Sequence, residues 1–397
     1  MPNAVVPVSF APATRKDVTI KERIGAIIVA LKVVAAIPIL VVKILLSAKA
    51  KSGKPWIYTL RSRILNFALA RVHPRQINLL SGPTAVGIYK FAKQLNVNVT
   101  TDELPHGARI HWWGEKKGQR VILYIHGGGY NLPIGEQHTG FMHRTKEVLK
   151  KNGIEVDVAI LEYSLTPAAR YPVQLRQSVE GLRYMISGCG YNPANIIFGG
   201  DSAGGCLVLS AVSHIMHPHP AIEPLVLPES SPKLGALLSI SPWVSFSTDY
   251  PSMKAQNNKD VVFPNFVEVW SRWLVDRPDE PRHKDLPPTD DKYTWDEYNQ
   301  PIQAAPSWWT GLPVKKTLIL IGEEETLCDS IIEFGQKFRE GVEMGAPAGE
   351  SGVKVVVCKG EIHTECLYDT FIPGMPPVLG MMAEEVWSLC EDTLKEN

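Results

Sequence analysis

One short stretch of the sequence carries a candidate nucleophile. Ser202 lies in Gly200-Asp201-Ser202-Ala203-Gly204-Gly205, between an apolar strand-like run and a helical run. A serine on a tight turn between a strand and a helix projects its hydroxyl above the sheet, and flanking glycines remove side chains that would collide there. The helix that follows adds a positive dipole end and free N–H groups. In this context the G-x-S-x-G spacing predicts nucleophilic catalysis by Ser202.

A second glycine-rich stretch, His126-Gly127-Gly128-Gly129, directly follows the apolar run Val121–Ile125. Consecutive glycines let backbone N–H groups turn toward a bound oxygen, and a tetrahedral intermediate needs two or three such donors. A lone glycine triplet is often only a turn, but both stretches stand at the carboxyl ends of strands, where α/β proteins form their sites. We therefore expect the N–H groups of Gly128, Gly129 and Ala203 to form an oxyanion hole.

A serine nucleophile requires a histidine base, and in this architecture the chain order is serine, acid, histidine. The histidines that follow the serine are His214, His217, His219, His283 and His363. The first three are too close to Ser202 in sequence to fold back onto it, and His283 lies in the insertion described below. His363 follows the strand-like run Val353–Val357 and is the predicted base.

The acid that orients the base is expected in the loop after the strand-like run Thr317–Ile321. This loop carries Glu323, Glu324, Glu325 and Asp329. Any of these four carboxylates is near enough in the chain to reach a histidine, and an acidic run is usually just solvated. The residue pattern alone leaves the choice open.

The elements that must position these residues alternate between strands and helices from about residue 108. We expect strands at Arg109–Trp113, Val121–Ile125, Val156–Ile160, Ile196–Gly199, Leu234–Ile240, Thr317–Ile321 and Val353–Val357. We expect helices at Gly140–Lys151, Pro172–Ser187, Gly204–Met216, Ser330–Gly345 and Met381–Lys395. Short apolar strands alternating with helices of this length predict an α/β fold, with a mostly parallel central sheet flanked by helices.

One long interval interrupts this alternation, between Pro242 and Pro313. It contains no convincing core strand, and its tryptophans are Trp243, Trp270, Trp273, Trp295, Trp308 and Trp309. Long insertions in α/β domains are either functional or disordered, and this density of tryptophan argues against disorder. We expect residues 108–397 to form the α/β domain, with a helical cap inserted at about 243–313. Helical patterns in residues 51–107 are expected to complete that cap.

The first 50 residues differ from the rest. We expect residues 1–20 to be disordered, and they are followed by a nearly continuous apolar run over residues 24–46, which is long enough to span a bilayer. Lys21, Lys32 and Lys43 fall on nearly the same helical face, which suits a helix lying in the membrane interface as well as a spanning one. A cleaved signal peptide fits poorly, and a soluble core helix is the remaining alternative. We expect membrane association through residues 24–46.

The overall composition excludes several classes of partner. Lys plus Arg and Asp plus Glu number 41 each, so no net field recruits nucleic acid. The six cysteines show no CxxC pairing, which favours scattered buried thiols over a metal site or a disulfide framework. We expect neither a metal nor another cofactor, and the oligomeric state is not readable from the sequence.

These residues resemble the hormone-sensitive-lipase-like branch of the α/β-hydrolases, over about residues 108–397. In that branch the acid is usually the first Asp of Asp-x-Leu-x-Asp, and here the segment reads Glu325-Thr326-Leu327-Cys328-Asp329. The resemblance implies that Glu325 is the catalytic acid and that Asp329 supports it, with Asp329 as the alternative acid. Glutamate replaces the usual aspartate, and either carboxylate can orient an imidazole.

A narrower resemblance is to the fungal steryl acetyl hydrolase group. It rests on Leu161-Glu162-Tyr163-Ser164-Leu165-Thr166-Pro167, on Tyr171-Pro172-Val173-Gln174-Leu175 and on Ser241-Pro242-Trp243. Members of that group carry an N-terminal membrane segment, and the resemblance implies deacetylation of sterols or related lipophilic alcohols. It also implies a place in lipid metabolism and an endoplasmic reticulum membrane location.

Three functions remain open at this point. The first is a serine esterase that removes a short acyl group, typically acetyl, from a lipophilic sterol or secondary metabolite. The second keeps the same hydrolase chemistry but acts on a lactone, a thioester or a polyketide intermediate. The third is a catalytically silent hydrolase scaffold that binds a ligand, although such proteins usually lose a catalytic residue and none is lost here.

Overall fold

The computed structural model describes residues 19–45, 56–69, 71, 84–166, 168–227, 232–256, 259–275, 295–347, 349–369 and 378–395. Most of the expected disordered start, residues 1–18, lies outside the described residues, and so does His283.

A central eight-stranded sheet organises the chain, in the order β1-β2-β4-β3-β5-β6-β7-β8. The strands are β1 (Val99–Glu103), β2 (Arg109–Trp113), β3 (Val121–Ile125), β4 (Asp157–Glu162), β5 (Ile196–Asp201), β6 (Leu234–Ile240), β7 (Val314–Gly322) and β8 (Val353–Cys358). Neighbours from β4 to β8 in this order pair in parallel, whereas β1 with β2 and β2 with β4 pair antiparallel. The sheet is therefore mostly parallel, as predicted.

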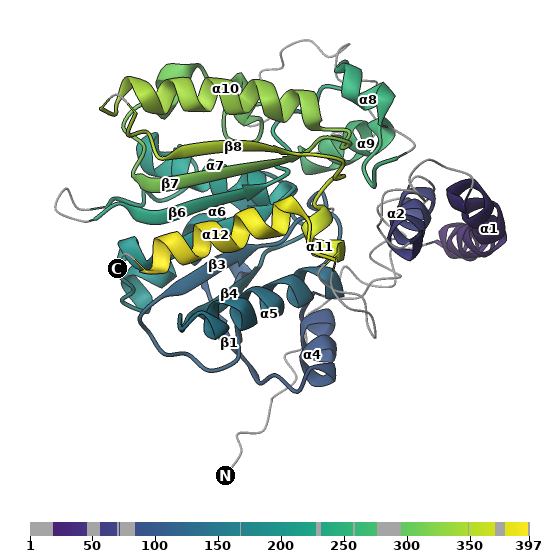
Figure 1. Ribbon diagram of the computed structural model, residues 1–397, viewed down its shortest axis with the longest axis horizontal. Helices are drawn as coiled ribbons and strands as arrows, with labels where there is room; N and C mark the ends of the chain where they lie inside the picture. The colour runs from purple at the N-terminus through teal and green to yellow at the C-terminus, as the bar shows by residue number, and fades with distance from the viewer. Residues whose placement is uncertain are drawn as a thin grey trace.

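Helices cover both faces of this sheet (Figure 1). The helices are α1 (Ile20–Leu45), α2 (Trp56–Leu69), α4 (Thr84–Gln94), α5 (Glu136–Lys151), α6 (Val173–Arg183), α7 (Ala203–Met216), α8 (Pro251–Ala255), α9 (Pro264–Leu274), α10 (Cys328–Met344), α11 (Glu365–Asp369) and α12 (Met381–Lys395). A π-helical turn, Tyr184–Gly188, continues α6, and short 3₁₀ turns lie at Pro105–Gly107, Pro193–Asn195, Pro301–Gln303 and Pro306–Trp309.

The parallel strands divide their side chains between two apolar cores. In β3, Val121 and Leu123 join the core beneath α6, α7 and α10, whereas Ile122 and Tyr124 join the core beneath α4, α5 and α12. Successive side chains of a strand point to opposite faces, so a strand buried on both faces is apolar throughout. This explains why the parallel strands were recognisable as continuous apolar runs.

The predicted strands and helices of the α/β domain are confirmed, with ends that differ by a few residues. The expected helical reading of residues 51–107 was wrong for Val99–Glu103, which forms β1 and pairs with β2. α2 and α4 also separate: α4 packs against α5, whereas α2 contacts the insertion through a 2.6 Å hydrogen bond from Asn66 to the Asp260 carbonyl. Of these two helices, α2 is therefore the one placed to contribute to the expected cap.

The insertion contains α8, α9 and two of the 3₁₀ turns, and its described residues 242–256, 259–275 and 295–313 include no strand. Its buried tryptophans are Trp243, Trp270, Trp273 and Trp309. Trp309 packs against Phe334 and Phe338 of α10, so it anchors the insertion to the domain. The role of this segment as a cap stays a prediction.

α1 is the one described helix that is long and apolar enough to cross a membrane. Within the segment Arg23–Leu45, an 18-residue stretch has a mean hydropathy of 2.7, and only 6% of that stretch is buried. Its exposed side chains include Ile24, Leu31, Val34 and Val42, each more than half exposed. This exposure does not fit a core helix of the described domain.

Candidate active site

The turn that presents Ser202 is strained, and its neighbours hold it in place. Ser202 has φ 51° and ψ −118°, a conformation that non-glycine residues rarely adopt. Its N–H donates to the carbonyl of Ile240 at 2.8 Å, and its carbonyl accepts the N–H of Trp243 at 3.0 Å. The backbone beyond the end of β6 thus fixes the serine at the junction of β5 and α7.

The glycines that flank the serine are required by close contacts. A methyl group at Gly204 would lie 2.1 Å from the carbonyl oxygen of Ile125, at the end of β3. A methyl group at Gly200 would lie 2.5 Å from the carbonyl oxygen of Gly204 itself. The tight turn predicted from the sequence therefore exists, and it is pressed against the start of the other glycine-rich loop.

That second loop, residues 126–129, is anchored to the turn by Asp201. The buried Asp201 carboxylate accepts the N–H of Gly127 at 2.8 Å and the hydroxyl of Tyr124. Burial raises the pKa of Asp201 in isolation, but His138 and these donors outweigh it, so the pKa is lowered and the carboxylate stays charged. Asp201, which directly precedes the candidate nucleophile, thus fixes the position of the glycine loop relative to Ser202.

The two glycines that follow Gly127 in this loop have unusual backbone conformations. Gly128 and Gly129 have φ values of 105° and 57°, and their carbonyl oxygens accept hydrogen bonds from Leu132 and Asn131 respectively. The N–H groups of Gly128, Gly129 and Ala203 donate to no protein group in the part of the chain that the structure describes. Buried backbone donors are nearly always paired, so the unpaired N–H groups of the buried Gly129 and Ala203 and of the half-buried Gly128 are suited to a bound oxygen.

His126 supports this loop from behind and is not a candidate base. Its ring stacks on Tyr163 with ring centroids 4.6 Å apart, and the Tyr163 hydroxyl donates to the His126 carbonyl at 2.9 Å. Burial, with the neighbouring His138, lowers the pKa of His126 to about 4. The neutral ring therefore has a packing role.

Two sequence-predicted residues, Glu325 and His363, form a buried pair. Glu325 Oε2 lies 2.8 Å from His363 Nδ1, and the exposed fractions of the two residues are 0% and 4%. Burial would lower the pKa of His363, but the contact with Glu325 and the nearby carboxylate of Asp260 outweigh it, so the pKa is raised. Burial also raises the pKa of Glu325, against the opposing effect of His363. This is the arrangement that orients an imidazole and stabilises its protonated form.

Asp329, the alternative acid, lies elsewhere. Its Oδ2 accepts the N–H of Ser252 in α8 at 2.8 Å, and the Ser252 hydroxyl lies 3.3 Å from the Asp329 N–H. Glu323 accepts the N–H of Gly360. Of the acids that the sequence left open, Glu325 is the one in contact with the predicted base.

Ser241 connects the turn at Ser202 to the loop of His363. It follows Ile240, which accepts the Ser202 N–H, and its own hydroxyl accepts the N–H of Thr364 at 3.1 Å. No direct hydrogen bond joins the Ser202 hydroxyl to the His363 ring among the described residues. Catalytic hydrogen bonds of this kind are commonly long without substrate and shorten in the reactive complex.

Aromatic side chains of the insertion lie against the glycine loop. A methyl group at Gly129 would lie 2.3 Å from the Trp270 ring and 2.6 Å from the Phe266 ring, both in α9. Phe266 and Trp270 are in contact, with ring centroids 3.8 Å apart, and Trp243 lies 5.6 Å from Phe266. These rings form an apolar wall beside the candidate oxyanion hole.

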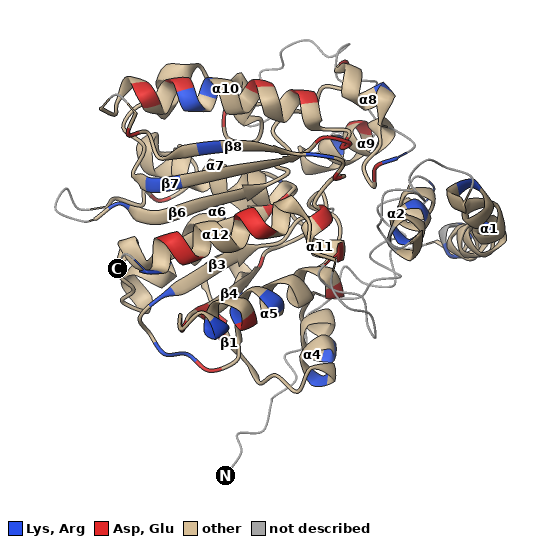
Figure 2. Cartoon of the chain, viewed as in Figure 1, with Lys and Arg blue, Asp and Glu red and all other residues tan. Residues whose placement is uncertain are grey.

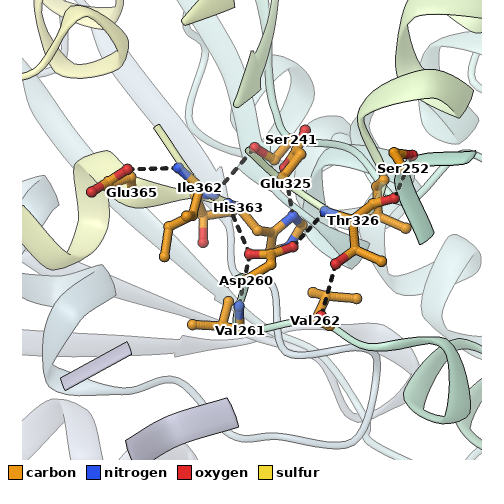
Figure 3. Close-up of polar contacts among 12 residues, drawn as sticks. Ser241, Ser252, Asp260, Val261, Val262, Glu325, Thr326, Ile362, His363 and Glu365 are labelled. Carbon is orange, nitrogen blue, oxygen red and sulfur yellow. Dashed lines mark hydrogen bonds and ion pairs between the residues drawn. The ribbon is translucent and has the colours of Figure 1, made fainter. Parts of the chain in front are cut away.

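Sequence reasoning missed Asp260, which is in direct contact with the His363 loop. Its Oδ1 accepts the N–H of His363 at 3.1 Å (Figure 3). Asp260 lies in the insertion and belongs to no recognisable spacing motif. Its only signal is an acidic residue directly before the apolar run Val261-Val262-Phe263, which is too common to single it out.

Comparisons with known proteins agree with this geometry. A family model described as alpha/beta hydrolase fold matches residues 122–366, more than half of the chain. The chain therefore belongs to the α/β-hydrolase fold family, and its motifs place it with the hormone-sensitive-lipase-like members, as predicted.

Two curated relatives and one solved structure illustrate the similarity. Steryl acetyl hydrolase 1 of Saccharomyces cerevisiae is 28% identical over 125 residues, which cover 32% of this chain and 27% of the relative. Esterase LipU of Mycobacterium tuberculosis is 29% identical over 146 residues, which cover 37% of this chain and 43% of the relative. The matches thus span less than half of either relative. The crystal structure of an esterase from the bacterial hormone-sensitive lipase family superposes with a TM-score of 0.58 at 19% identity, covering 85% of this chain and 97% of that chain.

Proposed function

We propose that this protein is a carboxylic ester hydrolase that uses Ser202 as its nucleophile. His363 takes the hydroxyl proton as Ser202 attacks the ester carbonyl, and Glu325 holds and stabilises the imidazolium that forms. The N–H groups of Gly128, Gly129 and Ala203 bind the oxyanion of the tetrahedral intermediate. His363 then donates its proton to the leaving alkoxide, and a water molecule hydrolyses the acyl-enzyme by the same route.

The observation that carries this proposal is the buried 2.8 Å contact between Glu325 and His363. Burying a carboxylate costs free energy unless the carboxylate is paired. Glu325 is paired with His363, which follows a strand at its carboxyl end, as Ser202 does. The strained backbone of Ser202 is a second cost that a purely structural serine would not require. Together these features support catalysis over a silent binding scaffold.

The aromatic wall supports a short acyl group. Phe266 and Trp270 lie against Gly129, so they limit the space on the side of the oxyanion hole that the acyl chain would enter. Several relatives carry names that fit this size, including an acetyl-hydrolase of Streptomyces hygroscopicus and an acetyl esterase of Salmonella schwarzengrund. We infer an acetyl or similarly short ester.

The N-terminal helices support a lipophilic alcohol delivered from a membrane. α1 exposes an apolar surface along its length, and beside this surface it exposes Lys21, Lys32 and Lys43 (Figure 2). Basic residues beside an apolar helix favour binding to an anionic lipid surface. Because the adjacent α2 contacts Asp260 near His363, a bilayer that binds α1 would lie close to the site. A sterol substrate and an endoplasmic reticulum location remain predictions.

The experiment that tests this function is hydrolysis by the full chain reconstituted in anionic phospholipid vesicles. We expect release of acetate from a vesicle-borne steryl acetate and from p-nitrophenyl acetate, with both activities lost in Ser202→Ala. Activity that persists in Ser202→Ala would contradict the nucleophile. Faster turnover of a lactone or thioester than of any acetate ester would keep the site and change the substrate class.

A further inference from the structure

Asp260, a buried carboxylate of the insertion, makes contacts that the reaction scheme above does not use. It lies between α8 and α9 and is 0% exposed. Its Oδ1 accepts the N–H groups of His363 at 3.1 Å and of Val261 at 2.7 Å, and its Oδ2 accepts the N–H of Thr326 at 2.7 Å. Figure 3 shows these three contacts converging on one side chain.

These contacts join both members of the acid–base pair. His363 contributes its own backbone, and Thr326 directly follows Glu325 in the chain. One carboxylate therefore sets the distance between the segment that carries the acid and the segment that carries the base. Neighbouring contacts strengthen the connection: the Thr326 hydroxyl donates to the Val262 carbonyl at 2.8 Å, and the Ser252 hydroxyl donates to the Thr326 carbonyl at 2.8 Å.

The same contacts favour the ionised form of Asp260. Burial raises the pKa of Asp260, and the three N–H donors and the His363 ring offset this rise only in part. A proton on either oxygen would face one of the N–H donors, so the protonated form loses a hydrogen bond that the carboxylate keeps. Buried carboxylates that accept several backbone N–H groups are stabilised in their charged form.

We propose that Asp260 is a positioning residue for the acid–base pair, and that its buried negative charge helps stabilise the His363 imidazolium. This inference rests on the proposed serine hydrolase function and extends it into the insertion. The inference gives the insertion a catalytic role, because the segment whose Phe266 and Trp270 line the proposed acyl pocket also positions His363.

The charged groups around His363 come from several elements. Glu325 lies before α10, Asp260 lies in the insertion and Asp201 lies at the end of β5, and all three raise the pKa of His363. Arg63 of α2 interacts electrostatically with both Asp260 and Glu324. Of the three carboxylates that raise the pKa of His363, Asp260 is the one that accepts the backbone N–H of His363 itself.

The test is the pH dependence of kcat/KM for p-nitrophenyl acetate in Asp260→Asn. The asparagine amide keeps one acceptor oxygen, but its NH₂ group faces the Thr326 N–H. The substitution also removes the negative charge of Asp260. We expect kcat to fall about 10–100-fold from misplacement of the base. We also expect the acid limb to move to lower pH by about 1 unit, because a nearby opposite charge shifts a pKa by about that much or more.

Asp296→Asn is the matched control. Asp296 is also in the insertion, and burial likewise raises its pKa. It accepts three donors as well: the Tyr171 hydroxyl at 2.6 Å and the N–H groups of Tyr298 and Asn299 at 3.0 and 2.9 Å. We expect the acid limb of this variant to stay at the wild-type pH. An Asp260→Asn enzyme whose acid limb does not move would overturn the inference, whatever its turnover.

Two further measurements keep the inference testable. If circular dichroism shows that Asp260→Asn does not fold, Asp260→Glu retains the charge and moves it by one methylene. We then expect wild-type pH dependence with kcat reduced about tenfold, and an undiminished kcat would overturn the inference. If the wild type shows no Ser202-dependent hydrolysis, the proposed function fails separately. The pKa of the His363 ring, followed by NMR in wild type and Asp260→Asn, then decides the influence of Asp260.

Discussion

Replacing Glu325 by Gln removes the charge that stabilises protonated His363 while nearly preserving shape. Glu325 is fully buried, and its Oε2 lies 2.8 Å from His363 Nδ1. The amide that replaces it cannot offset the positive charge of the imidazolium, and its N–H₂ group favours the wrong ring tautomer. Loss of the carboxylate in such a triad costs about 10⁴ in kcat, so we expect a fall of about 10³–10⁴, or about 4–5 kcal/mol in the activation barrier.

The matched control for this change is Asp329→Asn, at the alternative acid in the first turn of α10. Asp329 accepts the N–H of Ser252, and an asparagine oxygen can accept the same hydrogen bond. We expect kcat to stay within about tenfold of wild type, since the loss is limited to local stability. Both variants would be assayed with p-nitrophenyl acetate at saturating substrate, after thermal unfolding has shown that each is folded. A larger loss in Asp329→Asn than in Glu325→Gln would refute the assignment of the acid.

Three other predictions concern the base, the oxyanion hole and the acyl pocket. Because only neutral His363 accepts the Ser202 proton and its pKa is raised, kcat/KM should fall with decreasing pH along a limb centred above about 6.5; a limb below that value would contradict the role of Glu325. Gly129→Ala places a methyl group 2.3 Å from the Trp270 ring, so kcat should fall at least about 100-fold, and near-normal turnover would argue against the oxyanion assignment. Trp270→Ala should raise the ratio of octanoate to acetate hydrolysis by about tenfold or more, as judged by kcat/KM on p-nitrophenyl esters, and an unchanged ratio would remove Trp270 from the acyl pocket.

The sheet was predictable because its strands are apolar on both faces. β6, Leu234–Ile240, is a mostly apolar run, and both of its ends coincide with the predicted ones. β1 was not predicted because Val99–Glu103 is a polar edge strand, and its formation depends on its pairing with β2. A pattern within five residues cannot reveal a partner that folding brings alongside it.

The site was predictable to the extent that its chemistry lies in local motifs. Ser202 and the glycine loop stand in short patterns, and the geometry agrees with the choice of Glu325, which rested on resemblance. Asp260 was not predictable, because its hydrogen-bond donors lie 66 and 103 residues away along the chain, at Thr326 and His363. Its position depends on how the insertion folds back onto the sheet edge, which no local pattern encodes.

The most direct test of the account is the site of covalent labelling by a fluorophosphonate. This reagent reacts with a serine hydroxyl that a nearby base activates, so labelling requires the nucleophile and His363 to act together. We predict that mass spectrometry of the labelled full chain will locate the phosphonyl group on Ser202, and that Ser202→Ala and His363→Ala will not be labelled. Labelling at another residue, or labelling that persists in Ser202→Ala, would contradict the central claim.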